Sequence, residues 1–194
     1  MKTAFPKIYG EVVKFLDDNL PEYLTYHNTK HTLYVLEKAE HIAKKEHIKP
    51  AEIHLLKIAA LYHDIGYVKS HDEHEKESCA IAKRQLKTYG YSKDDIDAIC
   101  GMIMATKIPQ SPKNKLQEIL ADADLEYLAT SHFQEISDSL FQELKHYDPS
   151  LTIPEWDHIQ IDFIKKHTFH TSYCRHYKSF RKHKNLEFLK SKIK

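Results

Sequence analysis

The chain has 194 residues and a formal net charge of +1, with only four glycines and seven prolines. This length fills one domain and is short for two, and so few turn residues argue against the many hairpins of an all-β protein. A nearly neutral chain without a run of ~20 apolar residues is expected to be soluble, with neither a nucleic-acid polymer nor a membrane as a partner.

The three cysteines form no CxxC pair. A disulfide framework or a zinc knuckle is therefore not indicated, and a reducing, cytoplasmic location is expected. With helices as the default element, we predict an all-α fold in a single domain over residues 1–194. The sequence does not indicate an oligomeric state.

Apolar residues recur at helical spacing along the chain. They predict helices over 8–20, from a polar bend at 26–29 to 47, and over 50–64, 79–88, 92–103, 116–124, 133–144 and 159–170. The helix beginning at Pro50 is apolar on too many faces for a surface position, so it is predicted to be central. At its end, Gly66 is expected to adopt the left-handed conformation that stops a helix.

Two further local signals concern a helix start and a loop. Ser92 and Asp95 resemble a capping box, and residues 108–114, with two prolines, are predicted to form a loop. Core positions are predicted for Met102, Met104, Tyr62, Tyr67, Phe133, Phe141, Trp156 and Phe169.

The adjacent pair His63-Asp64 stands at the end of an apolar run, with His31 upstream and Asp122-Ala123-Asp124 downstream. Burying unpaired carboxylates or imidazoles costs several kcal/mol, and a bound metal ion is the simplest way to offset that cost. Two imidazoles and two carboxylates suit a divalent ion without selecting among Mn, Fe, Zn, Mg, Co and Ni. Ligands so far apart in sequence would converge from facing helices in a bundle core.

These residues, in this order, resemble the HD superfamily of metal-dependent phosphohydrolases. The resemblance rests on Tyr26-His27-Asn28-x-x-His31-Thr32, on the His63-Asp64 pair closing an apolar helix, and on Ala123-Asp124-Leu125. It implies a helical bundle of the HD-domain type with the metal site in its core. The core motifs would span about 26–128, with C-terminal helices over 129–194 packed on them.

The resemblance also implies which side chains bind the metal, namely His31, His63, Asp64 and Asp124, with Asp122 as a reserve candidate. Asp64 would also orient the attacking water. The context of His27 resembles the cyclic-nucleotide phosphodiesterase branch, in which this histidine protonates the leaving oxygen. On a continuing helix His27 would share a face with His31, and its alternative role is to cap that helix.

The segment after the pair, His74-Glu75-x-x-Ser78, resembles the one that supplies a second-metal ligand in two-metal relatives. The next helix, however, reads Met102-Ile103-Met104-Ala105-Thr106-Lys107 and offers no histidine. His74 is therefore either a metal or water ligand or a solvated loop residue. Lys107 and Arg175 are candidates for contact with a substrate phosphate, or simply members of a solvated basic face.

The function implied by the resemblance is hydrolysis of a phosphate ester, a nucleotide or a related small metabolite, by water activated at a divalent metal ion. The enzyme would be a phosphomonoesterase or a phosphodiesterase. One alternative is a non-catalytic domain that binds metal and nucleotide as a sensor or accessory module. A second is a di-iron oxygenase, which needs more histidines at the site than the sequence places there.

Overall fold

The computed structural model describes residues 4–193. Within this range all regular elements are helical, and the predicted all-α fold is confirmed. The α-helices are α1 (Phe5–Asn19), α2 (Thr29–Lys45), α3 (Pro50–Tyr62), α4 (His74–Thr88), α5 (Lys93–Met104), α6 (Lys115–Asp124), α7 (Phe133–Tyr147), α8 (Ile153–Lys166), α9 (Ser172–Tyr177) and α10 (Ser179–Lys192). Two 3-10 helices, η1 (Ile65–Val68) and η2 (Glu126–Ala129), follow α3 and α6.

Capping side chains explain where several helices begin. The Asn28 side chain accepts the backbone N–H groups of Lys30 and His31, so α2 begins at Thr29. The predicted capping box of Ser92 and Asp95 is present at the start of α5. A second one, Thr152 with Glu155, starts α8 at Ile153, earlier than the predicted residue 159.

C-terminal helices were expected over 129–194, but the apolar periodicity did not delimit α9 and α10. Their described buried residues are few, Cys174 in α9 and Leu186 and Leu189 in α10. Because so few apolar positions face the protein, these helices leave little periodic signal in the sequence. The helix predicted over 159–170 instead ends at Lys166, and residues 167–171 connect it to α9.

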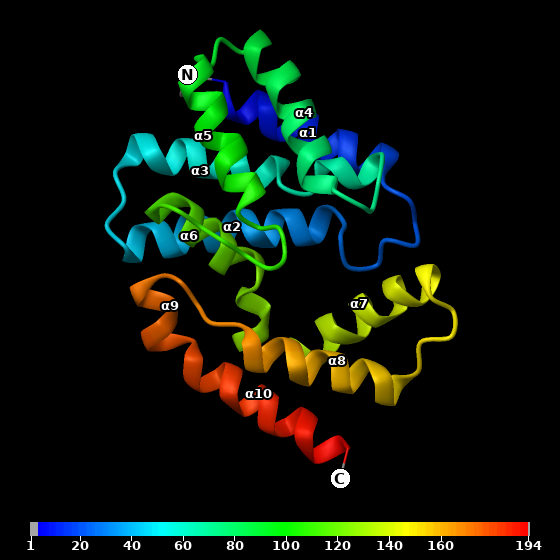
Figure 1. Cartoon of the computed structure of the whole chain (residues 1–194). Helices are drawn as coiled ribbons and strands as arrows, with labels where there is room; N and C mark the ends of the chain where they lie inside the picture. Colours follow the sequence, from blue (N-terminus) through cyan, green and yellow to red (C-terminus); the bar gives the residue numbers. More distant parts are fainter. Residues whose placement is uncertain (1–3, 194) are drawn as a thin grey trace.

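Helix α3 is central, as predicted. It packs against α2 and α5, and α2 also packs against α6. Its residues Ile58, Ala59 and Ala60 are fully buried, which explains why the sequence is apolar on so many faces of this helix. Figure 1 shows α1–α6 in the upper part of the view and α7–α10 below α2 and α6.

A second apolar cluster connects the lower helices to the upper ones. It joins Tyr26 and the η2 segment to side chains of α7, α8 and α10, including Phe133, Ile161 and Leu189. The connection also has a polar part, because the buried carboxylate of Glu126 accepts hydrogen bonds from Tyr34 and Lys178. The four C-terminal helices are thereby held against the ends of α2 and α6.

Glycine is needed at position 66 because it has no side chain. The expectation that Gly66 adopts a left-handed conformation was wrong. Among the described glycines only Gly90 has a positive φ. A Cβ atom at Gly66 would lie 2.0 Å from the carbonyl oxygen of His74. Glycine therefore lets η1 touch the first turn of α4. Among the described residues, no helix has both the length and the apolar character that crossing a membrane requires.

Candidate metal centre

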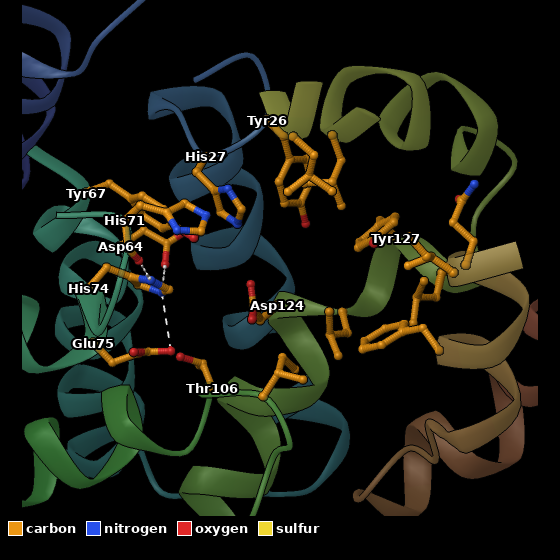
Figure 2. A pocket seen from close by; sticks show the side chains of 18 of the residues that line it. Tyr26, His27, Asp64, Tyr67, His71, His74, Glu75, Thr106, Asp124 and Tyr127 are labelled. Carbon is orange, nitrogen blue, oxygen red and sulfur yellow. Dashed lines mark hydrogen bonds and ion pairs between the residues drawn. The ribbon is translucent and has the colours of Figure 1, made fainter. Parts of the chain in front are cut away.

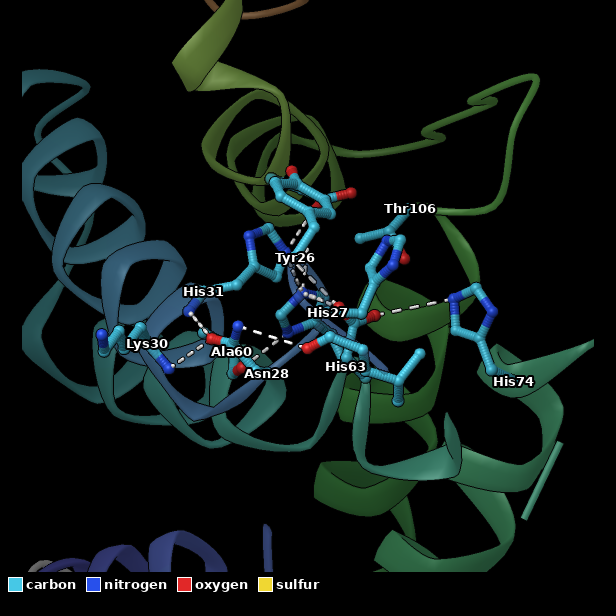
Figure 3. A network of polar contacts seen from close by, with 12 residues as sticks. Tyr26, His27, Asn28, Lys30, His31, Ala60, His63, His74 and Thr106 are labelled. Atoms are coloured by element: carbon cyan, nitrogen blue, oxygen red, sulfur yellow. Dashed lines mark hydrogen bonds and ion pairs between the residues drawn. The ribbon is translucent and has the colours of Figure 1, made fainter. Parts of the chain in front are cut away.

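The His63-Asp64 pair lies where α3 ends and η1 begins, and both side chains are buried. Nδ1 of His63 lies 2.8 Å from the backbone oxygen of Ala60. A carbonyl oxygen can only accept, so Nδ1 carries the hydrogen and Nε2 is the nitrogen free to bind a cation. Figure 3 shows His63 and Ala60 beside His31 in one network of polar contacts.

His31 from the first turn of α2 and Asp124 from the last turn of α6 meet the pair. Nε2 of His31 lies 3.3 Å from Nε2 of His63 and 3.1 Å from Oδ1 of Asp124. The same Asp124 oxygen lies 3.6 Å from Nε2 of His63. Oδ2 of Asp64 is 3.4 Å from the His31 nitrogen and 3.2 Å from the His63 nitrogen. Donor atoms of His31, His63 and Asp124 thus lie within 4.8 Å of one another, and Oδ2 of Asp64 lies against both histidines.

These separations fit a divalent cation. Bonds of about 2.1 Å to one ion place neighbouring ligand atoms about 3.0–3.4 Å apart in octahedral or tetrahedral geometry. Oδ2 of Asp64 is also buried and has no hydrogen-bond partner among residues 4–193, which is an unsatisfied position that a cation would satisfy. His31, His63 and Asp124 form a group able to hold a metal ion. Imidazole and carboxylate donors do not by themselves fix which metal it is.

The electrostatics of the cluster follow from burial and mutual charge. Burial lowers the pKa of His31 and His63, but the neighbouring carboxylates of Asp64 and Asp124 outweigh it and raise both pKa values. Burial raises the pKa of Asp64 and Asp124, yet the two histidines lower both, that of Asp124 to about 2. Without a cation the cluster holds protons that a metal ion would displace.

His27 lies just before α2 and is oriented by Glu143 of α7. One oxygen of the Glu143 carboxylate accepts the backbone N–H groups of Tyr26 and His27, at 2.9 Å each. The other contacts Nδ1 of His27. Burial raises the pKa of Glu143, but its contacts with His27 have the larger effect, and the pKa lies below its ordinary value. The carboxylate is therefore charged, and Nδ1 of His27 donates to it. Nε2 is then the ring nitrogen available to a ligand.

Tyr67 of η1 holds two histidines in place by stacking. Its ring lies 4.4 Å from that of His27 and 4.0 Å from that of His74, with interplanar angles of 21° and 20°. Nε2 of His74 lies 3.6 Å from Oδ1 of Asp64 and 3.5 Å from Oε1 of Glu75. His74 is therefore next to the metal centre and not a freely solvated loop residue.

A cavity of about 460 Å³ opens beside these groups. In Figure 2, His27, His74 and Asp64 lie on one side of it and Tyr127 on the opposite side, with Asp124 between them. Tyr67 and Trp156, expected as core residues, are buried but line this cavity. Phe133, Phe141 and Phe169 are buried as expected, and they are not among its lining residues.

The remaining candidates lie elsewhere. The carboxylate of Asp122 accepts the backbone N–H groups of His170 and Thr171, at 2.8 Å each, and is engaged in holding that segment. Lys107 contacts Glu73, 3.4 Å away, and Arg175 donates to the backbone oxygen of His170. Neither Lys107 nor Arg175 lines the cavity, so their positions give no support to a role in phosphate contact.

Sequence reasoning missed Glu143, which lies 116 residues after His27. An acidic residue in an amphipathic helix carries no local sign that it will be buried. The one available hint was its position between Phe141 and Leu144, on the apolar side of α7. The role of Tyr67 was missed for a related reason, since a buried aromatic residue is usually part of the core.

Comparison with known proteins gives a consistent result. The sequence profile of the HD domain matches residues 29–126. The fold is similar to a predicted HD superfamily hydrolase from an uncultured Thermotogales bacterium, with a TM-score of 0.64 and 21% identity over 94% of this chain and 90% of that one. It is also similar to Bacillus subtilis YpgQ in complex with ADP, with a TM-score of 0.66 and 21% identity over 95% and 93% of the two chains. No curated protein is significantly similar to the sequence.

Proposed function

Because the chain belongs to the HD domain family, we propose that it is a metal-dependent phosphohydrolase acting on a phosphate ester, a nucleotide or a related small metabolite. The observation that carries this proposal is the convergence of donor atoms from His31, His63 and Asp124, with Asp64 against both histidines, beside a cavity that His27 also lines. One similar structure is that of a predicted hydrolase and another contains ADP, which supports a nucleotide as the class to test first.

In this proposal His31, His63, Asp64 and Asp124 hold a divalent cation. When bound, such an ion lowers the pKa of its water, from ~15.7 toward ~7 for zinc, and polarises a phosphoryl oxygen. Asp64 orients the attacking water and accepts its proton. The hydrogen bond from His63 Nδ1 to Ala60 fixes the imidazole orientation, so no rearrangement is needed during turnover.

His27 is proposed to protonate the leaving oxygen. The carboxylate of Glu143 fixes the orientation of the ring through Nδ1. Tyr67 restricts the ring from one face by stacking. Nε2 can then donate its proton to an ester oxygen held in the cavity.

His74 is proposed as a ligand of a water molecule or of a second cation. Its Nε2 is within 3.6 Å of Oδ1 of Asp64 and Oε1 of Glu75, which together offer one nitrogen and two oxygen donors. Thr106 lines the cavity near this group and supplies a hydroxyl where two-metal relatives bring another histidine. One principal metal site with an auxiliary donor group is the arrangement we favour.

The test is a hydrolysis screen with the purified protein loaded in turn with Mn²⁺, Zn²⁺, Co²⁺ or Mg²⁺. Nucleoside monophosphates, cyclic nucleotides and other phosphate diesters are the substrates. Activity should vanish in His63→Ala and Asp64→Ala and persist in His132→Ala, which changes an exposed histidine of the loop before α7. Product release that these two site variants leave unchanged would refute the proposal.

A nucleotide-binding sensor remains the second candidate, because one similar structure holds ADP. Calorimetry on the metal-loaded protein separates the two. Tight nucleotide binding with no product after prolonged incubation would favour the sensor, whereas turnover that depends on His63 and Asp64 would favour the hydrolase.

A further inference from the structure

The wall of the cavity formed by the C-terminal helices is apolar and contains one buried amide, that of Gln160 in α8. Resting on the hydrolase function above, we propose that Gln160 determines specificity by donating a hydrogen bond to the body of the substrate. The substrate class is then a phosphate monoester with a flat, apolar or aromatic body that carries a ring nitrogen or carbonyl oxygen as acceptor. The base of a nucleotide is one such body.

The lining residues support an apolar body. On the side of α7, α8 and η2 they include Leu125, Leu128, Leu140, Leu144, Phe163 and Ile164. No lysine or arginine occurs among the described residues that line the cavity. Only the metal centre and its histidines can therefore offset the negative charge of a substrate, and these groups lie at one end of the cavity. A single phosphate at that end and an uncharged body along the apolar wall fit this distribution.

Gln160 is the exception on this wall. Its side chain is more than nine-tenths buried, and Nε2 has no hydrogen-bond partner among the described residues. A buried amide nitrogen without a partner is unfavourable unless a ligand or water satisfies it. A substrate acceptor entering the cavity would supply the missing partner.

Two neighbouring side chains fix which end of the amide is free. The indole nitrogen of Trp156 can only donate, and it donates to Oγ of Ser137 over 3.1 Å. The Ser137 hydroxyl in turn donates to Oε1 of Gln160 over 2.5 Å. If the amide were reversed, Ser137 would accept two hydrogen bonds and its own buried hydrogen would lose its acceptor. The Trp156–Ser137–Gln160 chain thus leaves the NH₂ group, a donor, without a partner in a residue that lines the cavity.

The experiment compares two kinds of ester that differ by one ring atom. Naphthyl phosphate has an aromatic body without an acceptor, and the quinolinyl phosphates replace one ring CH by nitrogen at each position in turn. With the metal-loaded wild-type protein we expect at least one quinolinyl ester to have about 10-fold higher kcat/KM than naphthyl phosphate, the effect of one buried hydrogen bond.

The variants Gln160→Met and Gln160→Leu remove the donor while keeping an apolar wall. They should abolish that preference and leave naphthyl phosphate hydrolysis within about threefold of wild type. Gln142→Leu, an exposed glutamine on α7, is the matched control and should keep the preference. Equal hydrolysis of both esters by the wild type, or an unchanged preference in both Gln160 variants, would overturn the proposal while leaving the hydrolase function intact.

Binding separates this proposal from the proposed function. Calorimetry with the metal-free protein measures the affinities of the naphthols and quinolinols, which are the bodies without phosphate. If no ester is hydrolysed, tighter binding of a quinolinol that disappears in Gln160→Met still upholds the role of Gln160. Equal affinities in wild type and variant would overturn it.

Discussion

His63 and His27 illustrate how the partner of one ring nitrogen assigns the other. Nδ1 of His63 is engaged by the Ala60 carbonyl, so its Nε2 faces the cation position. Nδ1 of His27 is engaged by Glu143, which leaves its Nε2 available beside the cavity. The first environment suits a neutral ligand and the second suits a proton donor.

Substitution should separate the two roles. His63→Ala removes a proposed metal ligand and should abolish both metal binding and hydrolysis. His27→Ala should retain the metal and lower kcat about 10²–10⁴-fold, the usual contribution of a general acid. Metal content by atomic emission and steady-state kinetics on the same samples provide the measurement. Equal loss of metal in the two variants would remove His27 from the role of acid.

At the scale of elements, the contact between η1 and α4 depends on Gly66. Alanine there would bring Cβ to 2.0 Å from the His74 oxygen and 2.8 Å from the Ser78 nitrogen, both of which are backbone atoms. We expect Gly66→Ala to lower the free energy of unfolding by about 1–3 kcal/mol and to weaken metal binding, because η1 and α4 flank Asp64. Urea unfolding and metal titration measure the two effects.

Gly10→Ala is the matched control for this change. Gly10 lies inside α1, where an added Cβ meets no atom within 4 Å. Alanine should leave stability unchanged or raise it by about 0.5–1 kcal/mol through helix propensity. If both alanine variants change the free energy of unfolding equally, the close approach of η1 and α4 is not what requires glycine at position 66.

The junction of α8 and α10 should make stability depend on pH. Burial, and then the charges of Lys182 and His170, lower the pKa of His167 to about 3. The ordinary value near 6.5 applies in the unfolded chain, so between these values the unfolded state binds more protons. The contribution is complete above pH 6.5 and declines as the pH falls toward 3, by about 1–2 kcal/mol between pH 7 and pH 5.

Urea unfolding of wild type and His167→Gln at pH 7 and pH 5 measures this contribution. Other groups titrate in both proteins, so the difference between their pH dependences isolates His167. The loss of stability on acidification should be smaller in the variant. Identical losses would mean that His167 is protonated in the folded protein.

The helices that could be predicted from sequence are those that bury one face or all of their faces. Helix α3 and the capping box at Ser92 are indicated by residues that are close together in the sequence. Helices α9 and α10 do not, because few of their side chains are buried. At the site, the order of His31, His63-Asp64 and Asp124 indicated a shared centre. Glu143 and Gln160 are placed there by contacts between distant segments, which no local pattern encodes.

On the scale of the whole molecule, the chain divides its chemistry between two regions. The span matched by the HD domain, 29–126, contains the four proposed metal ligands, His31, His63, Asp64 and Asp124. The C-terminal helices contribute Glu143, which orients His27, and Gln160 on the apolar wall of the cavity. In the proposed function, substrate choice would depend mainly on residues outside the span that holds the proposed metal ligands, so it could change without altering them.

Metal binding should stabilise the entire protein, because the ligands come from α2, the end of α3 and the end of α6. These segments are far apart in the unfolded chain, so the ion binds the folded state selectively. At 100 times Kd the stabilisation is about 2.7 kcal/mol, which for a chain of this size raises Tm by about 5–10 °C. Calorimetric scans with Mn²⁺ or with a chelator measure the shift. His63→Ala should show none, and an equal shift in this variant would place the stabilising ion at a different site.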